Sequence, residues 1–196
     1  MCIRDSALAG HLLGSAALAE IGATAALYGL IMNFAFGMNN GLALTVSRCF
    51  GAGEREGIRR AVGWMVTLSA AVSIVLTTVS LLGRGALLQV LQVPAEVWDG
   101  AAAYLTVILL GIPLTMLYNM EAALLRAVGN SVTPLLFLLF SSVLNVGLDA
   151  AFMGPLGMGV RGAAVATVLA QGISAVLGAV YLVRSYPCLL YTSPSP

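Results

Sequence analysis

Lysine is absent from this chain of 196 residues, and charged side chains of any kind are scarce. Only 9% of the residues are charged, whereas soluble domains carry roughly 25%, so a water-soluble globule is excluded. The net charge of +1 also argues against a nucleic-acid partner, which would need a basic face. One histidine and three cysteines without a CxxC spacing give no metal-site or disulfide pattern. We therefore predict an integral membrane protein, not a soluble enzyme.

Apolar residues make up 60% of the sequence and are gathered into long runs. A membrane-spanning helix needs about 20 mostly apolar residues. Five segments meet this length, and they are predicted over residues 22–47, 61–82, 101–125, 133–153 and 162–183. The stretch 7–18 resembles the end of a truncated earlier helix, and LLQVL (87–91) is predicted to form a brief interfacial helix. The predicted fold class is an all-α, polytopic helical bundle.

The two ends of the chain differ from everything between them. MCIRD at the N-terminus and CLLYT near the C-terminus can both be encoded by one oligonucleotide, read in opposite directions. We therefore expect residues 1–5 and 188–196 to be tails derived from a sequencing adapter, and we leave both out of the fold argument. Residues 6–187 are expected to be an internal piece of a longer protein.

The arginines divide unequally between the two sides that the predicted spans define. One side carries six arginines and the other carries two; the six are Arg48, Arg55, Arg59, Arg60, Arg126 and Arg184, and the two are Arg84 and Arg161. Loops rich in basic residues stay on the cytoplasmic side of a membrane. The loop GAGEREGIRR (51–60) is therefore predicted to be cytoplasmic.

Polar residues recur at helical spacing inside three of the predicted spans. Residues four apart share one face of a helix, and the stripes are Ser69, Ser73, Thr77 and Ser80; Ser141, Asn145 and Asp149; and Ala163, Thr167, Gln171 and Ser174. Small and hydroxyl-bearing residues commonly let helices pack closely in a membrane. Helix packing is the interpretation we favour for the first stripe.

Asp149 is the acidic residue that lies well inside the fourth predicted span. A carboxylate at membrane depth must be protonated, paired or bound to a cation. Asn145 offers a carbonyl oxygen one turn away, and Thr167 offers a hydroxyl if the fifth span packs against the fourth. Such oxygen ligands suit a hard cation, although a neutral Asp149 hydrogen-bonded to a neighbouring helix is an alternative. Glu121 lies close to Arg126 in sequence, which predicts a solvated or arginine-paired side chain.

Three stretches together resemble the multidrug and toxic compound extrusion (MATE) transporters. They are GLALTVSRCFGAGEREGIRRAV; YLTVILLGIPLTMLYNMEAALLRAVGNSVTPL, with Tyr104, Pro113, Arg126 and Gly129 in place; and SSVLNVGLDAAFMGPLGMGVRGAAVATVLAQ. The resemblance covers nearly all of residues 7–183. It implies a truncated six-helix N-terminal lobe, from the end of helix one through helix six, of a twelve-helix fold whose missing C-terminal lobe completes it.

The resemblance also implies a function and a site. Family members export organic cations and other amphipathic drugs across the bacterial cytoplasmic membrane in exchange for Na⁺ or H⁺, without another cofactor. Their N-lobe cation site carries over here to Asn145, Asp149, Ala163 and Thr167. Its helix-one aspartate falls on Asp5, within the N-terminal tail. The fragment alone is expected to be inactive.

A substrate cavity and two rival functions complete the predictions. Aromatic, methionine and amide side chains suit a cavity for a hydrophobic cation, and the candidate lining residues are Tyr28, Asn33, Met116, Asn119 and Gln171. A lipid-linked oligosaccharide flippase of the same superfamily is one alternative, although the lack of mid-membrane basic residues counts against it. A non-transporting membrane scaffold, whose polar stripes only pack helices, is the other.

Overall fold

The computed structural model describes residues 15–186, except 91, 92 and 94. In this part of the chain the structure is helical, without strands. The elements are α2 (Ser15–Gly51), α3 (Arg55–Leu82), α4 (Arg84–Val90), the short 3₁₀ helix η1 (Ala95–Val97), α5 (Trp98–Leu110), α6 (Ile112–Ala127), α7 (Val132–Met153) and α8 (Val160–Ser185). The predicted tails 1–5 and 188–196 and the candidate residue Asp5 lie outside the described residues.

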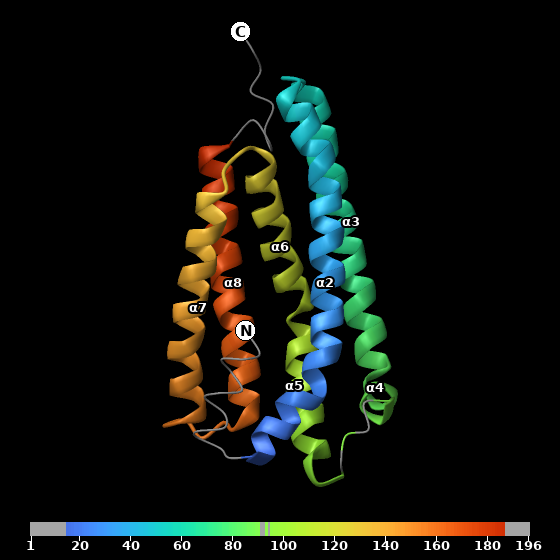
Figure 1. Ribbon diagram of the computed structural model, residues 1–196, viewed down its shortest axis with the longest axis vertical. Helices are drawn as coiled ribbons and strands as arrows, with labels where there is room; N and C mark the ends of the chain where they lie inside the picture. The colour runs from blue at the N-terminus through green and yellow to red at the C-terminus, as the bar shows by residue number, and fades with distance from the viewer. Residues whose placement is uncertain (1–14, 91–92, 94, 187–196) are drawn as a thin grey trace.

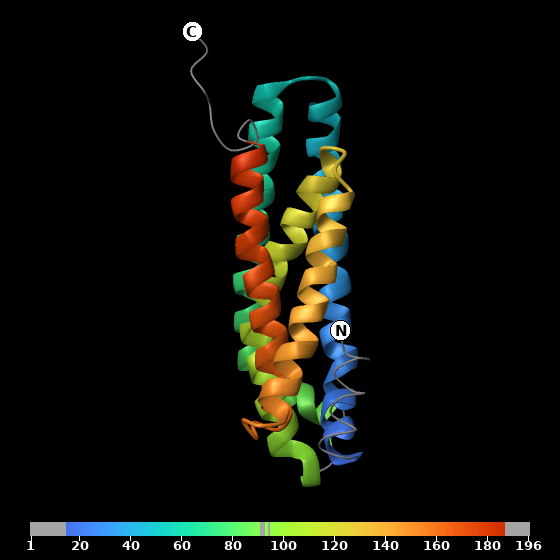
Figure 2. The ribbon, with the colours of Figure 1, turned by 90° about the vertical axis from the view of Figure 1, so that its left-hand side faces the viewer.

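The long helices form one elongated bundle along a common axis. In Figure 1, α2 and α3 lie along one side of the bundle and α7 and α8 along the other, with α5 and α6 between them. Figure 2 shows the same arrangement turned by 90°. The inter-helix contacts agree, since α8 packs against both α7 and α6, and α6 packs against both α2 and α3. The all-α bundle predicted from the sequence is thus confirmed.

Four of the five predicted spans meet the length and composition of a membrane-spanning helix. Among the described residues these are α3, α7 and α8, together with α5 and α6 taken as one bent span. The first predicted span lies within α2, a helix of 37 residues whose described side chains include Asn33, Asn39 and Asn40. The inside of the bundle holds the buried polar side chains together with an apolar core, whereas further large apolar side chains such as Leu135, Leu139 and Val143 are exposed outside, as a lipid solvent requires.

The third predicted span, 101–125, is a bent pair of helices, α5 and α6, in the structure. The chain bends by 45° between α5 and α6. Gly111 stands at the bend, and Pro113 lies in the first turn of α6. Proline has no backbone N–H and its ring crowds the preceding turn, so a bend at this position has an identifiable cause.

Two smaller boundary predictions also change. The loop predicted over 51–60 is mostly helical, because α3 begins at Arg55 and only Ala52–Glu54 separate it from α2. Gly53 makes this short turn possible with a positive φ of 68°, which glycine adopts without strain. The short helix predicted over 87–91 is present as α4, which begins three residues earlier, at Arg84.

The two ends of the bundle separate the arginines as predicted. The α2–α3 turn, the α6–α7 turn and the C-terminal end of α8 lie at one end in both views (Figures 1 and 2). The last turns of α2, α6 and α8 contain Arg48, Arg126 and Arg184, and α3 opens on Arg55. The first residues of α4 and α8, which carry Arg84 and Arg161, lie at the opposite end. We call these the basic end and the opposite end.

Candidate functional site

The buried face of α7 is the polar stripe seen in the sequence. Its buried residues are Pro134, Ser141, Asn145, Asp149 and Met153. Asp149 has no exposed surface, and Asn145 is 1% exposed. The rest of the helix is mostly exposed leucine, valine and phenylalanine, which turns the stripe inward because a lipid-facing position would leave its polar groups unsolvated. The carboxyl group of Asp149 is therefore held inside the bundle, in the half that ends at the α7–α8 turn.

Helix α8 presents its own small and polar face to this stripe. Asn145 Nδ2 donates a hydrogen bond to Thr167 Oγ1 over 3.3 Å, and both side chains are buried. Helices α7 and α8 are antiparallel neighbours. One helical turn from this hydrogen bond, toward the α7–α8 turn, Asp149 of α7 is therefore level with Ala163 of α8. Ala163 is fully buried. The structure thus brings Asn145, Thr167, Asp149 and Ala163 together at one seam.

The close approach of the two helices depends on a residue without a side chain. A Cβ at Gly162 would lie 3.0 Å from Phe152 Cβ and 3.1 Å from the Phe152 carbonyl carbon. No larger residue fits at this crossing without moving one helix. In the sequence, Gly162 stood out only as part of a stretch that resembles the MATE family, although small residues at membrane helix contacts are a general signal.

The chemistry of this seam is that of oxygen atoms. It offers a carboxylate, a side-chain amide oxygen, a hydroxyl and the backbone carbonyl of Ala163. Among the described residues no three histidine, cysteine, aspartate or glutamate side chains gather to hold a metal ion. Most transition metals favour nitrogen or sulfur ligands, whereas oxygen ligands suit a proton or a hard cation. The seam can therefore hold a small cation or a proton at Asp149.

Two of the five candidate cavity residues lie in different parts of the bundle. Tyr28 of α2 is half-buried and packs against the cluster that contains Tyr104, Met153 and Ala163, next to the Asp149 seam. Met116 of α6 is 1% exposed and packs with other apolar residues of α2 and α5.

The other three candidates are likewise dispersed. Asn33 is exposed, and its Nδ2 donates to the carbonyl oxygen of Gly29 in its own helix over 2.9 Å. Asn119 is half-buried and donates to the carbonyl oxygen of Thr115 over 2.8 Å. Gln171 is buried in the α6–α8 seam, where Thr115 Oγ1 donates to its Oε1. The five residues therefore do not line one common cavity in this lobe.

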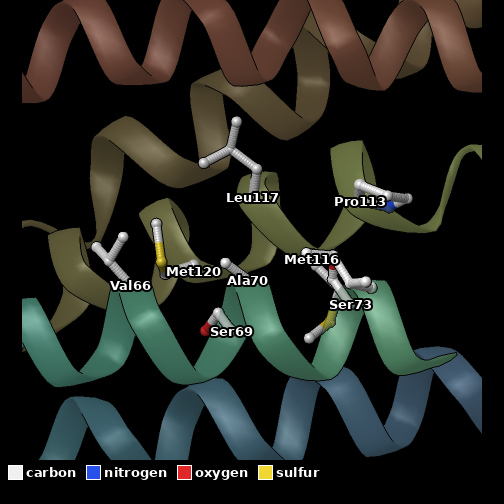
Figure 3. A pocket seen from close by; sticks show the side chains of 9 residues that line it. Val66, Ser69, Ala70, Ser73, Pro113, Met116, Leu117 and Met120 are labelled. Atoms are coloured by element: carbon white, nitrogen blue, oxygen red, sulfur yellow. The ribbon is translucent and has the colours of Figure 1, made fainter. Parts of the chain in front are cut away.

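Met116 instead lines an apolar cavity between α3 and α6. Figure 3 shows this cavity from close by. It has a volume of about 300 Å³ and is lined by Val66, Ser69, Ala70, Ser73, Ile74, Pro113, Met116, Leu117 and Met120. Pro113, beside the bend, and two methionines form its α6 wall, and methionine side chains adapt to ligands of different shape.

Asn119 lines a second cavity, where α2, α6 and α7 meet at the basic end. Its volume is about 290 Å³, and its wall includes Phe36, Tyr118 and Arg126. The guanidinium of Arg126 lies 5.7 Å from the centre of the Phe36 ring, and its Nη2 donates to Asn40 Oδ1 over 3.2 Å. The arginine is thus directed toward α2.

Glu121 is the residue whose position the sequence prediction got wrong. It was expected to be solvated or paired with Arg126, but it is 4% exposed and forms no ion pair among the described residues. Five residues along a helix correspond to a rotation of about 140° from the starting side chain, so Glu121 and Arg126 point to different neighbours. The spacing itself was the signal that was missed, because only pairs three or four apart meet on a helix.

The serine stripe of α3 behaves as predicted for helix packing. Ser69, Ser73 and Ser80 are buried. Ser69 Oγ donates to Asn39 Oδ1 of α2 over 2.7 Å, and Asn39 in turn donates to the carbonyl oxygen of Ala35 over 3.0 Å. This network fixes α3 against α2.

Comparisons with known proteins agree with this arrangement. The MatE family model matches residues 1–151. YpnP of Bacillus subtilis, described as a probable multidrug resistance protein, is 32% identical over 180 residues, which are 92% of this chain and 40% of that protein. NorM of Thermotoga maritima, also described as a probable multidrug resistance protein, is 29% identical over 175 residues, covering 87% of this chain and 38% of NorM.

Solved structures show the same likeness in three dimensions. A crystal structure of a MATE protein in the bent conformation has a TM-score of 0.90 and 27% identity, covering 99% of this chain and 44% of that one. An inward-facing multidrug resistance MATE family transporter has a TM-score of 0.88 and 25% identity, covering 99% of this chain and 42% of that one. The chain therefore spans about two fifths of the length of the curated relatives it matches. Because the family model covers most of its residues, the chain belongs to the MatE family of multi-pass membrane transporters.

Proposed function

We propose that this chain supplies one lobe of an antiporter that exports amphipathic or cationic drug-like molecules in exchange for Na⁺ or H⁺ across the bacterial cytoplasmic membrane. The observation that carries the proposal is the α7–α8 seam. A fully buried carboxylate, Asp149, lies one helical turn from an amide–hydroxyl pair, Asn145 and Thr167. Two relatives described as probable multidrug resistance proteins support the export of drugs.

The coupling ion would act through Asp149. An ion shifts a conformational equilibrium only by the difference in its affinity for the two states. A seam that closes around a buried carboxylate binds a cation or proton more tightly than an opened, hydrated seam. Binding would then favour the conformation in which α7 and α8 are tightly packed. Ala163 and Thr167, which sit on the α8 side of the seam, would contribute a carbonyl and a hydroxyl oxygen to the ion.

The substrate would bind on apolar surface lined by adaptable side chains. The cavity beside Met116 and Met120 has the flexible methionines and the two buried serines, Ser69 and Ser73, that suit an amphipathic molecule (Figure 3). The cavity beside Asn119 carries Arg126, which would repel a cation near it. We therefore assign the first cavity to a cationic substrate and leave the second outside its path.

The test uses a gene that encodes a protein as long as the relatives. It compares the same substitution, aspartate to asparagine, at two positions. Asp149→Asn should abolish the efflux of a fluorescent lipophilic cation from proteoliposomes energised by a Na⁺ or pH gradient. Asp99→Asn, the same change at an exposed position at the start of α5, should leave efflux unchanged. Wild-type efflux by Asp149→Asn would overturn the assignment of the ion site. Absence of gradient-dependent efflux in the wild type would favour the scaffold, and selective transport of lipid-linked sugars would favour the flippase.

A further inference from the structure

A second acidic side chain is buried in this lobe, in the seam between α6 and α8. Glu121 is 4% exposed. Its Oε2 atom is inaccessible and accepts no hydrogen bond within the part of the chain that the structure describes. A bare carboxylate in such a position is costly, and a buried acid avoids that cost by taking up a proton. The expected pairing with Arg126 does not supply the missing charge, because no ion pair joins them.

Helix α8 is shaped to receive this carboxyl group. A Cβ added at Gly178 would collide with Glu121 Oε2 and would lie 3.3 Å from the carboxyl carbon. Ser174 lies one turn before Gly178 on the same face and has no exposed surface. Its Oγ also has no hydrogen-bond partner among the described residues. The seam thus places a glycine-sized recess against one buried carboxyl group, and a buried hydroxyl lies one turn away on α8.

Within the part of the chain that the structure describes, no basic group forms an ion pair with Glu121. Its own helix carries Tyr118 and Arg126, whose guanidinium hydrogen-bonds to Asn40 of α2. The ionisable residues of the neighbouring helices lie toward their ends or outside this seam: Tyr28, Arg48 and Cys49 in α2; Arg55, Glu56, Arg59 and Arg60 in α3; Asp99 and Tyr104 in α5; Asp149 in α7; and Arg161, Tyr181 and Arg184 in α8. Tyr181 accepts a hydrogen bond from Asn130 over 3.3 Å.

The described side chains of this seam offer few oxygen atoms to a metal cation. A hard cation such as Ca²⁺ takes about six to eight oxygen ligands, whereas Glu121 and Ser174 offer one carboxylate and one hydroxyl. A proton needs only one oxygen. Among the described side chains, the chemistry of the seam therefore favours a proton over a divalent cation.

The position of Glu121 relates it to Asp149 through α8. Three buried polar residues of α8, Thr167, Gln171 and Ser174, follow one another along the helix, and we call them the α8 polar column. Asn145 of α7 donates to Thr167, and Thr115 of α6 donates to Gln171. Ala163, level with Asp149, and Gly178, against Glu121, bracket the column. At 1.5 Å per residue they are about 22 Å apart, most of the roughly 30 Å thickness of a bilayer core.

We propose that Glu121 is a second proton-binding carboxyl group of this lobe, joined to Asp149 by the α8 polar column. Proton binding at Glu121 stands without any transport activity, whereas its use in transport rests on the proposed function. In that use, protons would reach Glu121 from the basic end and Asp149 from the opposite end. Chains of acidic and polar residues serve as proton relays in other membrane proteins.

Infrared spectroscopy of the chain in lipid tests the proton directly. A protonated carboxyl group gives a C=O stretching band that an ionised one lacks and that shifts in D₂O. The wild type should show a band at neutral pH that disappears in Glu121→Gln and persists in Glu56→Gln, the same change at an exposed acid of α3. An unchanged band in Glu121→Gln from acidic to alkaline pH would overturn the proposal. Asp149→Asn should leave the Glu121 band in place.

Two glycine-to-alanine variants test whether the recess at Gly178 on α8 holds the Glu121 carboxyl group. Gly178→Ala should shift the frequency of the Glu121 band, because the added methyl group displaces the carboxyl group from its recess. Gly147→Ala of α7, where an added Cβ meets nothing within 4 Å, should leave the frequency unchanged. Equal spectra for the two variants would refute the recess. If the band is present but Asp149→Asn retains full efflux, the proposed function fails while the proton site at Glu121 stands.

Discussion

Adding one methyl group at Gly162 should weaken the α7–α8 seam on which the candidate ion site depends. In Gly162→Ala the new Cβ would lie 3.0 Å from Phe152 Cβ and 3.2 Å from Met158 Cβ. Neither atom can rotate away, because a Cβ position is fixed by its backbone. Overpacking of this kind costs about 1–3 kcal/mol, and the better helix propensity of alanine returns at most about 1 kcal/mol. We therefore expect a net loss of about 0–2 kcal/mol in the free energy of unfolding.

Gly147→Ala is the matched control, because it places the same methyl group on α7 in open space. Because the added methyl group meets no clash, only the better helix propensity of alanine acts. The free energy of unfolding of Gly147→Ala should therefore rise by about 0.5–1 kcal/mol. Equilibrium unfolding in mixed detergent micelles, followed by circular dichroism, would rank the two variants against the wild type. The reasoning is refuted if Gly162→Ala is as stable as Gly147→Ala.

Gly162→Ala should also weaken the hydrogen bond between Asn145 and Thr167 at the candidate site. Moving α8 away from α7 lengthens the 3.3 Å contact between Asn145 and Thr167. Removing the hydroxyl with Thr167→Val should then cost less in the Gly162→Ala background than in the wild type, since little of the hydrogen bond remains to be lost. Equal costs in both backgrounds would mean that the seam does not open at this level.

Two further predictions concern buried hydrogen bonds between helices. Thr167→Val alone should lower the unfolding free energy by about 0.6 kcal/mol, and by no more than about 1.7 kcal/mol, the mean and the maximum for such bonds between membrane helices. A double-mutant cycle with Asn145→Leu would show whether the two side chains are coupled. Ser69→Ala should cost a similar amount by removing the 2.7 Å donor to Asn39, and the neighbouring change Ser73→Ala, for which the structure shows no bond to α2, should cost less. Equal effects of the two serine changes would contradict the assignment of the network.

Much of this architecture was predictable because a membrane imposes simple rules on sequence. Apolar runs must be long enough to cross, and their backbone must be satisfied within each helix. Polar residues on one face must then turn inward, which is why the stripe of Ser141, Asn145 and Asp149 identified the buried face of α7. The separation of arginines between the basic end and the opposite end followed from counting residues alone.

Other features depend on details that periodicity does not carry. The bend between α5 and α6 was signalled by Gly111 and Pro113 but was hidden within a run of apolar residues of ordinary length. The start of α3 was placed too late, because charged residues at a membrane surface suit a helix as well as a loop. The five candidate cavity residues were chosen by side-chain type, and type does not reveal which helices will face one another.

The two buried acids, Asp149 and Glu121, separate what can be predicted from a single helix from what depends on how the helices pack. Asp149 shares its helix face with other polar residues, so its burial could be inferred from its own helix. Glu121 lies among Met120, Ala122 and Ala123, all of which are buried as well, so no face of α6 stands out by polarity. Its environment is set by Gly178, which is 57 positions away in the sequence. A residue whose role is defined by the absence of a side chain on another helix can be found only when the two helices are seen together. Because α8 provides the partner surface for both acids, Thr167 toward α7 and Gly178 toward α6, any movement of α8 must change the surroundings of both at once.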